Sequence, residues 1–115
     1  MSAAEIVGRQ LDAYNGRDLD AFMACWAADA RILAWPGTLL AEGAETIRER
    51  HGRRFAEPHL HACLLSRIAI GELVVDHERV TRDHHGRAIE VEVIAIYEVR
   101  DGLIRTAWFK QDPLL

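Results

Sequence analysis

The chain has 115 residues, half of them hydrophobic, and a formal charge of −4. This length and composition suit a single folded domain over residues 1–115, and the negative charge argues against broad binding to nucleic acid. No apolar run is long enough to cross a bilayer and no signal peptide is visible, so we expect a cytoplasmic protein without membrane partners. The two cysteines, Cys25 and Cys63, do not indicate a disulfide framework.

Three amphipathic helices and two short strands are predicted in the N-terminal half. The first helix ends before Gly16, and Asp18 then caps the second helix, whose apolar stripe extends to Trp26. The third helix carries His51 in its inward row. The expected ranges are residues 2–15 and 44–56 for the first and third helices, and residues 29–35 and 38–42 for the two strands, which Pro36-Gly37 separates.

Four long strands follow, and they are joined by turns so short that neighbouring strands must be antiparallel. They are expected over residues 59–70, 73–82, 88–100 and 103–111. Helices followed by strands predict an α+β fold, with three N-terminal helices packed on a strongly curved, mostly antiparallel sheet that encloses a pocket.

Alternation along each strand sorts its side chains into two faces. In the second long strand Asp76 and Glu78 share a face with valines, and in the third strand the face with Tyr97 is apolar whereas the other carries three glutamates. We expect the helices to cover both of these faces. In the first long strand the same rule predicts a single row formed by His59, His61, Cys63, Leu65 and Arg67.

Ionisable side chains on a covered face are candidates for acid–base catalysis. Asp76 and Glu78 repel each other there, so one of them can have a raised pKa and transfer protons. We take Asp76 as the proton-transfer residue, oriented by Arg67 and by His51 or His61. The alternative is that Asp76 and Arg67 form a buried structural ion pair.

Aromatic residues are expected to form apolar walls for a ligand beside Glu78. Trp35, Tyr97 and Phe109 are the candidates, whereas Trp108 falls on the outer face of its strand.

A metal site built from His59, His61 and one of the acids is the weaker alternative, because no further ligand spacing supports it. We therefore predict neither a metal nor a cofactor. A group of arginines at helical spacing is expected to form a solvated helix face, and it comprises Arg48, Arg50, Arg53 and Arg54.

Several short motifs occur in an order that is specific to one fold. The segment NGRDLD at residues 15–20, followed by WAADA at 26–30, resembles the helix-turn-helix-strand opening of the nuclear transport factor 2-like superfamily. GAETIR at 43–48 is similar to the start of its third helix, and AIYEVRDGLI at 95–104 to its closing hairpin. The most similar branch contains the polyketide cyclase-like (SnoaL-like) and ketosteroid isomerase-like proteins.

The resemblance implies a cone-shaped domain with a pocket at its wide end and homodimers formed through the outer face of the sheet. The catalytic positions of ketosteroid isomerase align with Ala34 or Trp35, with Ala95 and with Gln10, none of which matches. Steroid isomerisation by that mechanism is therefore not expected. Gln10 is instead expected to contact a bound molecule.

Together these observations predict a pocket protein that binds a small hydrophobic molecule. It would be a cofactor-independent acid–base enzyme of the isomerase, cyclase or dehydratase type acting on a hydrophobic carbonyl compound. The alternative is a non-catalytic ligand-binding or dimeric assembly module of the same fold.

Overall fold

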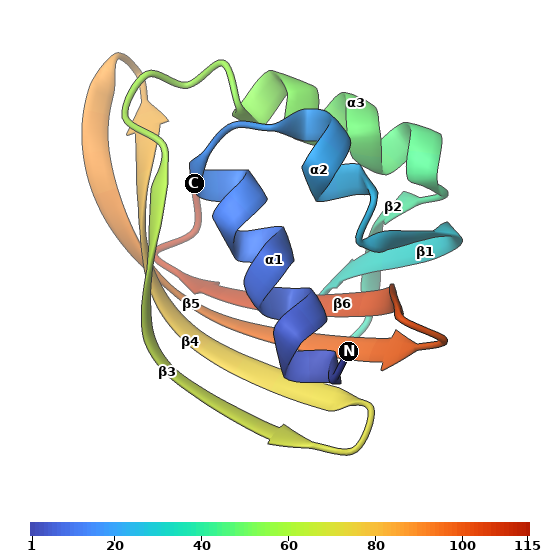
Figure 1. Cartoon of the computed structure of the whole chain (residues 1–115). Coiled ribbons are helices and arrows are strands. Elements are labelled where there is room, and N and C mark those ends of the chain that lie inside the picture. Colours follow the sequence, from blue (N-terminus) through green and yellow to red (C-terminus); the bar gives the residue numbers. More distant parts are fainter.

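Three helices cover the concave face of one six-stranded sheet in the computed structural model, which describes all of residues 1–115 (Figure 1). The helices are α1 (Ala3–Asn15), α2 (Leu19–Met23) and α3 (Ala44–Arg54). The strands are β1 (Trp26–Ala34), β2 (Thr38–Glu42), β3 (His61–Ile70), β4 (Leu73–His84), β5 (Arg87–Arg100) and β6 (Leu103–Asp112). The predicted α+β fold is confirmed. None of the helices is long and apolar enough to cross a membrane.

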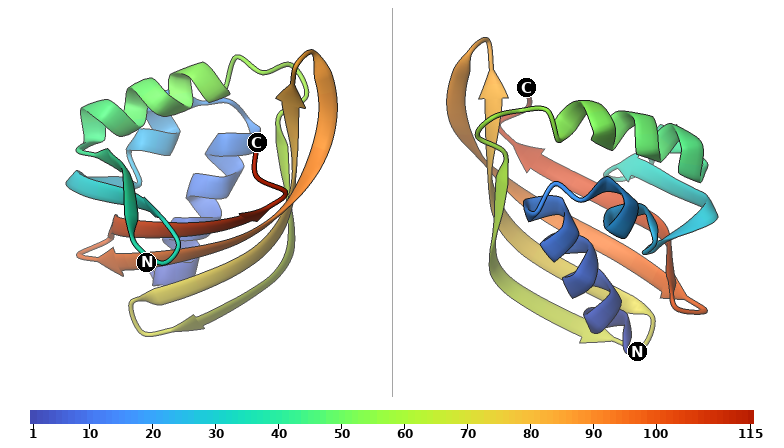
Figure 2. Two further views of the ribbon diagram at one scale, coloured as in Figure 1. Left: turned by 180° about the vertical axis from the view of Figure 1, so that it is seen from behind. Right: turned by 45° about the horizontal axis from the view of Figure 1, so that its top comes forward.

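The sheet is mostly antiparallel and strongly bent. Its strand order is β2-β1-β6-β5-β4-β3, and only the β1–β6 pair is parallel. The far ends of β4 and β5 curl up beside the end of α3, and α1 lies across the hollow of the sheet (Figure 2). Most of the buried apolar side chains fill the space between these helices and the sheet.

Helix α1 is fixed at both of its ends. At its start, Ser2 and Glu5 form a capping box, in which each side chain accepts from the backbone N–H of the other residue. At its end, the Asn15 side chain donates to the carbonyl of Ala62 at 2.9 Å and accepts from the N–H of Ala62 at 2.8 Å. These bonds hold α1 against β3.

Helix α2 is shorter than predicted. It ends at Met23, and Trp26 is the first residue of β1 rather than part of the helical stripe. The parallel pairing with β6 is responsible, because Trp26 pairs with Ile104 and the N–H of Ile104 donates to the carbonyl of Cys25 at 2.8 Å. Trp26 is buried in either case, which is why its apolar character did not distinguish helix from strand. The third helix also ends two residues earlier than predicted, at Arg54.

An irregularity in β3 makes the predicted row of that strand wrong. Leu64 pairs with Glu78 and Ser66 with His77, so Leu65 has no partner and the strand bulges there. Because the side-chain period is two, one extra residue changes the face of every side chain beyond it. Arg67 therefore lies opposite Asp76 on the concave face, whereas His61 lies opposite Thr81 and is exposed on the outer face.

The predicted covered face of β4 is confirmed, since Val74, Asp76, Glu78 and Val80 are all buried. Asp76 has no exposed surface and binds Arg67 through two bonds, Nε to Oδ1 at 2.7 Å and Nη2 to Oδ2 at 2.9 Å. Helix α1 closes over this pair at Gly8, where an added Cβ would lie only 3.3 Å from Nη1 of Arg67. Asp76 was expected either to transfer protons or to form a buried ion pair with Arg67, and the structure shows the ion pair.

The ion pair generates a prediction about stability. Asp76→Asn keeps the shape of the side chain but leaves the Arg67 guanidinium without its counter-charge, so we expect the free energy of unfolding to fall by on the order of 3 kcal/mol, roughly 10 °C in Tm. The matched control is Asp29→Asn, which affects an exposed pair with Arg105 whose atoms are 3.4 Å apart and is expected to cost less than about 1 kcal/mol. Equal changes in the two melting curves would show that the Arg67–Asp76 pair is not structural.

Candidate functional site

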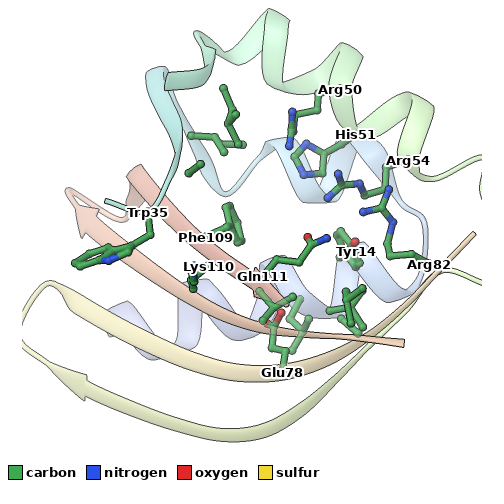
Figure 3. Close-up of a pocket in the computed structure, with 18 of the residues that line it drawn as sticks. Tyr14, Trp35, Arg50, His51, Arg54, Glu78, Arg82, Phe109, Lys110 and Gln111 are labelled. Atoms are coloured by element: carbon green, nitrogen blue, oxygen red, sulfur yellow. The ribbon is translucent and has the colours of Figure 1, made fainter. Parts of the chain in front are cut away.

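A cavity of about 280 Å³ opens between α3 and the wide end of the sheet, with α1 along one side (Figure 3). It is lined by 21 residues, of which 13 are hydrophobic, so its wall is mostly apolar with a few polar groups. Sites for small organic molecules have this composition. Trp35, Leu40 and Leu114 form an apolar rim, at which the Trp35 side chain points away from the interior (Figure 3).

The structure brings six of the nine predicted site residues to this cavity. The six that line it are Gln10, Trp35, His51, Glu78, Tyr97 and Phe109. Asp76 and Arg67 do not line it, because their ion pair lies deeper, under α1. His61 does not line it either, because the bulge turns it outward. The carboxylate that lines the cavity is therefore that of Glu78. Asp76 does not face the cavity, as proton transfer to a ligand there would require.

Glu78 is a buried carboxylate without a cation of its own. Its side chain projects from β4 at the floor of the cavity, and its Oε2 atom is buried without a hydrogen-bond partner (Figure 3). The pKa of Glu78 is raised to about 7, mainly by burial and also by the negative charge of Asp76, whereas the charge of Arg67 opposes the increase. Near neutral pH this group therefore exists in both protonation states, as a general acid or base should.

His51 faces the cavity from α3 as a neutral imidazole. Its pKa is lowered to about 4, mainly by burial, with a smaller contribution from the charges of Arg54, Arg50 and Arg82, and a bond between Nδ1 and the carbonyl of Ile47 opposes this decrease. That bond is 3.0 Å long. A carbonyl can only accept, so Nδ1 carries the proton and Nε2 is left as an acceptor. The ring also packs on Phe22, with 4.4 Å between centroids.

Tyr97 supplies a neutral hydroxyl on the β5 side of the cavity. Burial raises the pKa of Tyr97 well above its usual value, and the nearby carboxylates of Glu78 and Asp76 raise it further. The phenol therefore stays protonated and can donate a hydrogen bond. Phe109 packs edge-on against its ring at 5.9 Å between centroids, which fixes the ring in the wall.

Three arginines of the cavity wall were not predicted as site residues. Arg50 and Arg54 project from α3 and Arg82 from β4, and all three side chains are directed toward the cavity (Figure 3). The expected solvated face is therefore wrong for Arg50 and Arg54. The helical spacing in the sequence could have predicted this position. Arg50 and Arg54 are three and seven positions after the buried Ile47, so they lie on the covered side of the helix.

No group of three or more His, Cys, Asp or Glu side chains is placed to hold a metal ion. His59 instead bonds to Asp83, with 2.7 Å between Nδ1 and Oδ1, and His61 is on the outer face of β3.

Comparisons with known proteins agree on the fold. A family model described as a SnoaL-like domain matches residues 7–107. An uncharacterised cystatin-fold protein from Novosphingobium aromaticivorans superposes with a TM-score of 0.87 at 27% identity, covering 96% of this chain and 98% of that chain. No curated protein matches the chain in sequence.

Two further solved structures have lower identity and show the fold alone. IdmH from Streptomyces antibioticus, a proposed polyketide cyclase, has a TM-score of 0.81 at 21% identity, with 97% of this chain and 93% of that chain covered. A protein with a ketosteroid isomerase-like fold from Catenulispora acidiphila, solved in complex with trimethylamine, has a TM-score of 0.78 at 20% identity, with 92% and 84% covered. Since the family model spans most of the sequence and the neighbours share the fold over nearly the whole chain, the protein belongs to the SnoaL-like domain family, with the ketosteroid isomerase-like (nuclear transport factor 2-like) fold.

Proposed function

We propose that the protein is a cofactor-independent acid–base enzyme that acts on a small, mostly apolar carbonyl compound, with Glu78 as the proton-transfer residue. The observation that carries this proposal is the unpartnered carboxylate of Glu78 at the floor of an apolar cavity, with a pKa of about 7. A general base is most effective when its pKa lies near the working pH. Asp76, our first candidate from the sequence, forms an ion pair with Arg67 and lies outside the cavity.

The proposed step is abstraction of a proton from the carbon next to the carbonyl. The C–H bond breaks, the proton forms an O–H bond on Glu78, and the electron pair moves to the carbonyl oxygen to give an enolate. A neutral O–H donor such as that of Tyr97 stabilises the charge on this oxygen. In a β,γ-unsaturated ketone the enolate extends over the second double bond and takes the proton back from Glu78 at the γ carbon, as in an isomerase. In a substrate with a second carbonyl the α carbon instead bonds to that carbonyl carbon, whose C=O π bond breaks while its oxygen takes the proton from Glu78, as in a cyclase.

Hydrogen–deuterium exchange tests this proposal without knowledge of the natural substrate. We expect the protein to accelerate exchange of the acidic C–H of 2-tetralone in D2O, measured by NMR, with a rate that rises as Glu78 loses its proton and levels off above about pH 7. The exchange rate catalysed by Glu78→Gln should be at least about 100-fold lower than that of the wild type. Glu90→Gln, an exposed glutamate on β5, is the matched control.

Failure of the wild-type protein to accelerate exchange while it binds 2-tetralone would favour the non-catalytic binding module. Acceleration that survives in Glu78→Gln would assign the chemistry to another group.

The raised pKa of Glu78 also predicts how stability depends on pH. The folded state holds the proton up to about pH 7, whereas the unfolded chain releases it near 4.5, so the stabilising contribution is complete below pH 4.5 and is lost as pH rises through 7. Relative to Glu78→Gln, the wild type should therefore lose on the order of 3 kcal/mol of unfolding free energy between about pH 5 and pH 8.5 in urea titrations. A constant difference between the two proteins over this range would contradict the assigned pKa.

We also propose that two copies of the chain associate through the outer face of the sheet. One apolar row crosses all six strands on that face, because its members pair from strand to strand in the order Leu39, Leu33, Trp108, Ile96, Val75 and Ile68. Ile68 is 70% exposed, and Ile70 on the same face is 81% exposed. A second copy of the same surface would cover such a row in a symmetric, self-complementary interface.

Replacement of a central residue of this row tests the association. We expect the wild-type protein to have the mass of a dimer in light scattering at micromolar concentrations, and Ile96→Glu to have that of a monomer because a carboxylate would be buried at the interface. Circular dichroism of Ile96→Glu should retain the native spectrum. A monomeric wild type, or a dimeric Ile96→Glu protein, would rule out this interface.

A further inference from the structure

The wall of the cavity opposite Glu78 is positively charged. Arg50 and Arg54 enter it from successive turns of α3, and Arg82 enters from the end of β4 (Figure 3). Glu78 is on the far side, and the charges that act on its pKa are those of Asp76 and Arg67 rather than these arginines. The cavity thus has an acidic floor and a separate cationic wall.

Two of these three arginines form no ion pair in the protein. Glu57 binds Arg82 through both oxygens, at 2.9 Å to Nε and 2.7 Å to Nη2, and also accepts from the backbone N–H of Asp83. Arg50 and Arg54 form no ion pair, although Arg48 on the same helix pairs with Asp20. His51 between them is neutral. The charge of Arg54 acts on Glu57, but both oxygens of that carboxylate already bind Arg82. Three arginines therefore share one carboxylate at the cavity wall.

This arrangement costs free energy in the empty protein. Burial lowers the pKa of Arg50, and the like charges of Arg54 and Arg82 lower it further. Like charges four residues apart on a helix are destabilising. The helix dipole favours cations in the last turn, but the exposed Arg53 already provides one there. Neither the dipole nor a solvated surface accounts for half-buried arginines directed into a cavity.

We infer that the ligand of this cavity carries an oxyanion, a carboxylate or a phosphate ester, that Arg50 and Arg54 bind while its apolar part extends toward Glu78. The guanidinium fork matches the planar or tetrahedral oxygens of both groups. A cavity of 280 Å³ limits the apolar part to one or two rings. The inference rests on the proposed function only in that both place the ligand in this cavity, and it is independent of any chemistry at Glu78.

Three naphthalene probes of one shape test the inference by isothermal titration calorimetry. They are 2-naphthoate, 2-naphthyl phosphate and the uncharged 2-acetonaphthone. The wild type should bind at least one of the two anions about tenfold or more tightly than the ketone, and the preferred anion identifies the group that the site accepts. Arg50→Gln and Arg54→Gln should each weaken binding of that anion about fivefold or more, while ketone affinity stays within about twofold.

Arg53→Gln is the matched control, since it removes the same charge from the same helix at an exposed position outside the cavity wall. It should leave all three affinities unchanged. Equal affinity of the wild type for anions and ketone, no binding of either anion at millimolar concentration, or an equal loss in Arg53→Gln would each overturn the inference. The comparison of anion with ketone in the wild type stands even where a variant fails to fold.

The same probes separate this inference from the proposed proton transfer. Glu78→Gln should retain the preference for the anion, because Glu78 is on the opposite side of the cavity. Anion preference together with binding of 2-tetralone but no exchange would overturn the proton transfer alone. Exchange without anion preference would overturn the inference alone.

Discussion

The interior chemistry depends on one cation, the guanidinium of Arg67, which lies beside two neighbouring carboxylates and binds only one of them. Asp76 and Glu78 are successive inward residues of β4, and Arg67 forms both of its bonds with Asp76. Burial raises the pKa of Glu78, and the neighbouring negative charge of Asp76 raises it further. Asp76 and Glu78 thus have the same chemistry but different roles, one structural and one titrating near neutral pH.

The fold separates these roles in space as well as in charge. Helix α1 closes over the Arg67–Asp76 pair, helped by the absence of a side chain at Gly8. Helix α3 stands further from the floor of the sheet and leaves the cavity between His51 and Glu78 open (Figure 3). The region under α1 is therefore structural, whereas the cavity under α3 presents an acid, a neutral imidazole, a phenol and two arginines that form no ion pair.

Much of this could be predicted from the sequence, because regular strands follow simple alternation. The faces of β4 and β5 were predicted correctly, since the two strands pair without irregularity from Leu73–Glu98 to His84–Arg87. On β3 the same rule misplaced His61, because nothing in the sequence marks the bulge at Leu65. Likewise, Trp26 has an apolar side chain that suits a buried helix or a buried strand equally well, and only its pairing with β6 decides between them.

The choice between two carboxylates was beyond the sequence for a different reason. Arg67 forms an ion pair with whichever of Asp76 and Glu78 it lies opposite, and strand register decides which one that is. The bulge at Leu65 sets this register, so the interior chemistry depends on the number of residues in β3 as well as on the identity of Arg67. Among relatives, a gain or loss of one residue between Leu64 and Arg67 would exchange inner and outer faces on one side of the bulge, so a one-residue gap in this stretch would change the pairing of Asp76 as surely as a substitution of Arg67.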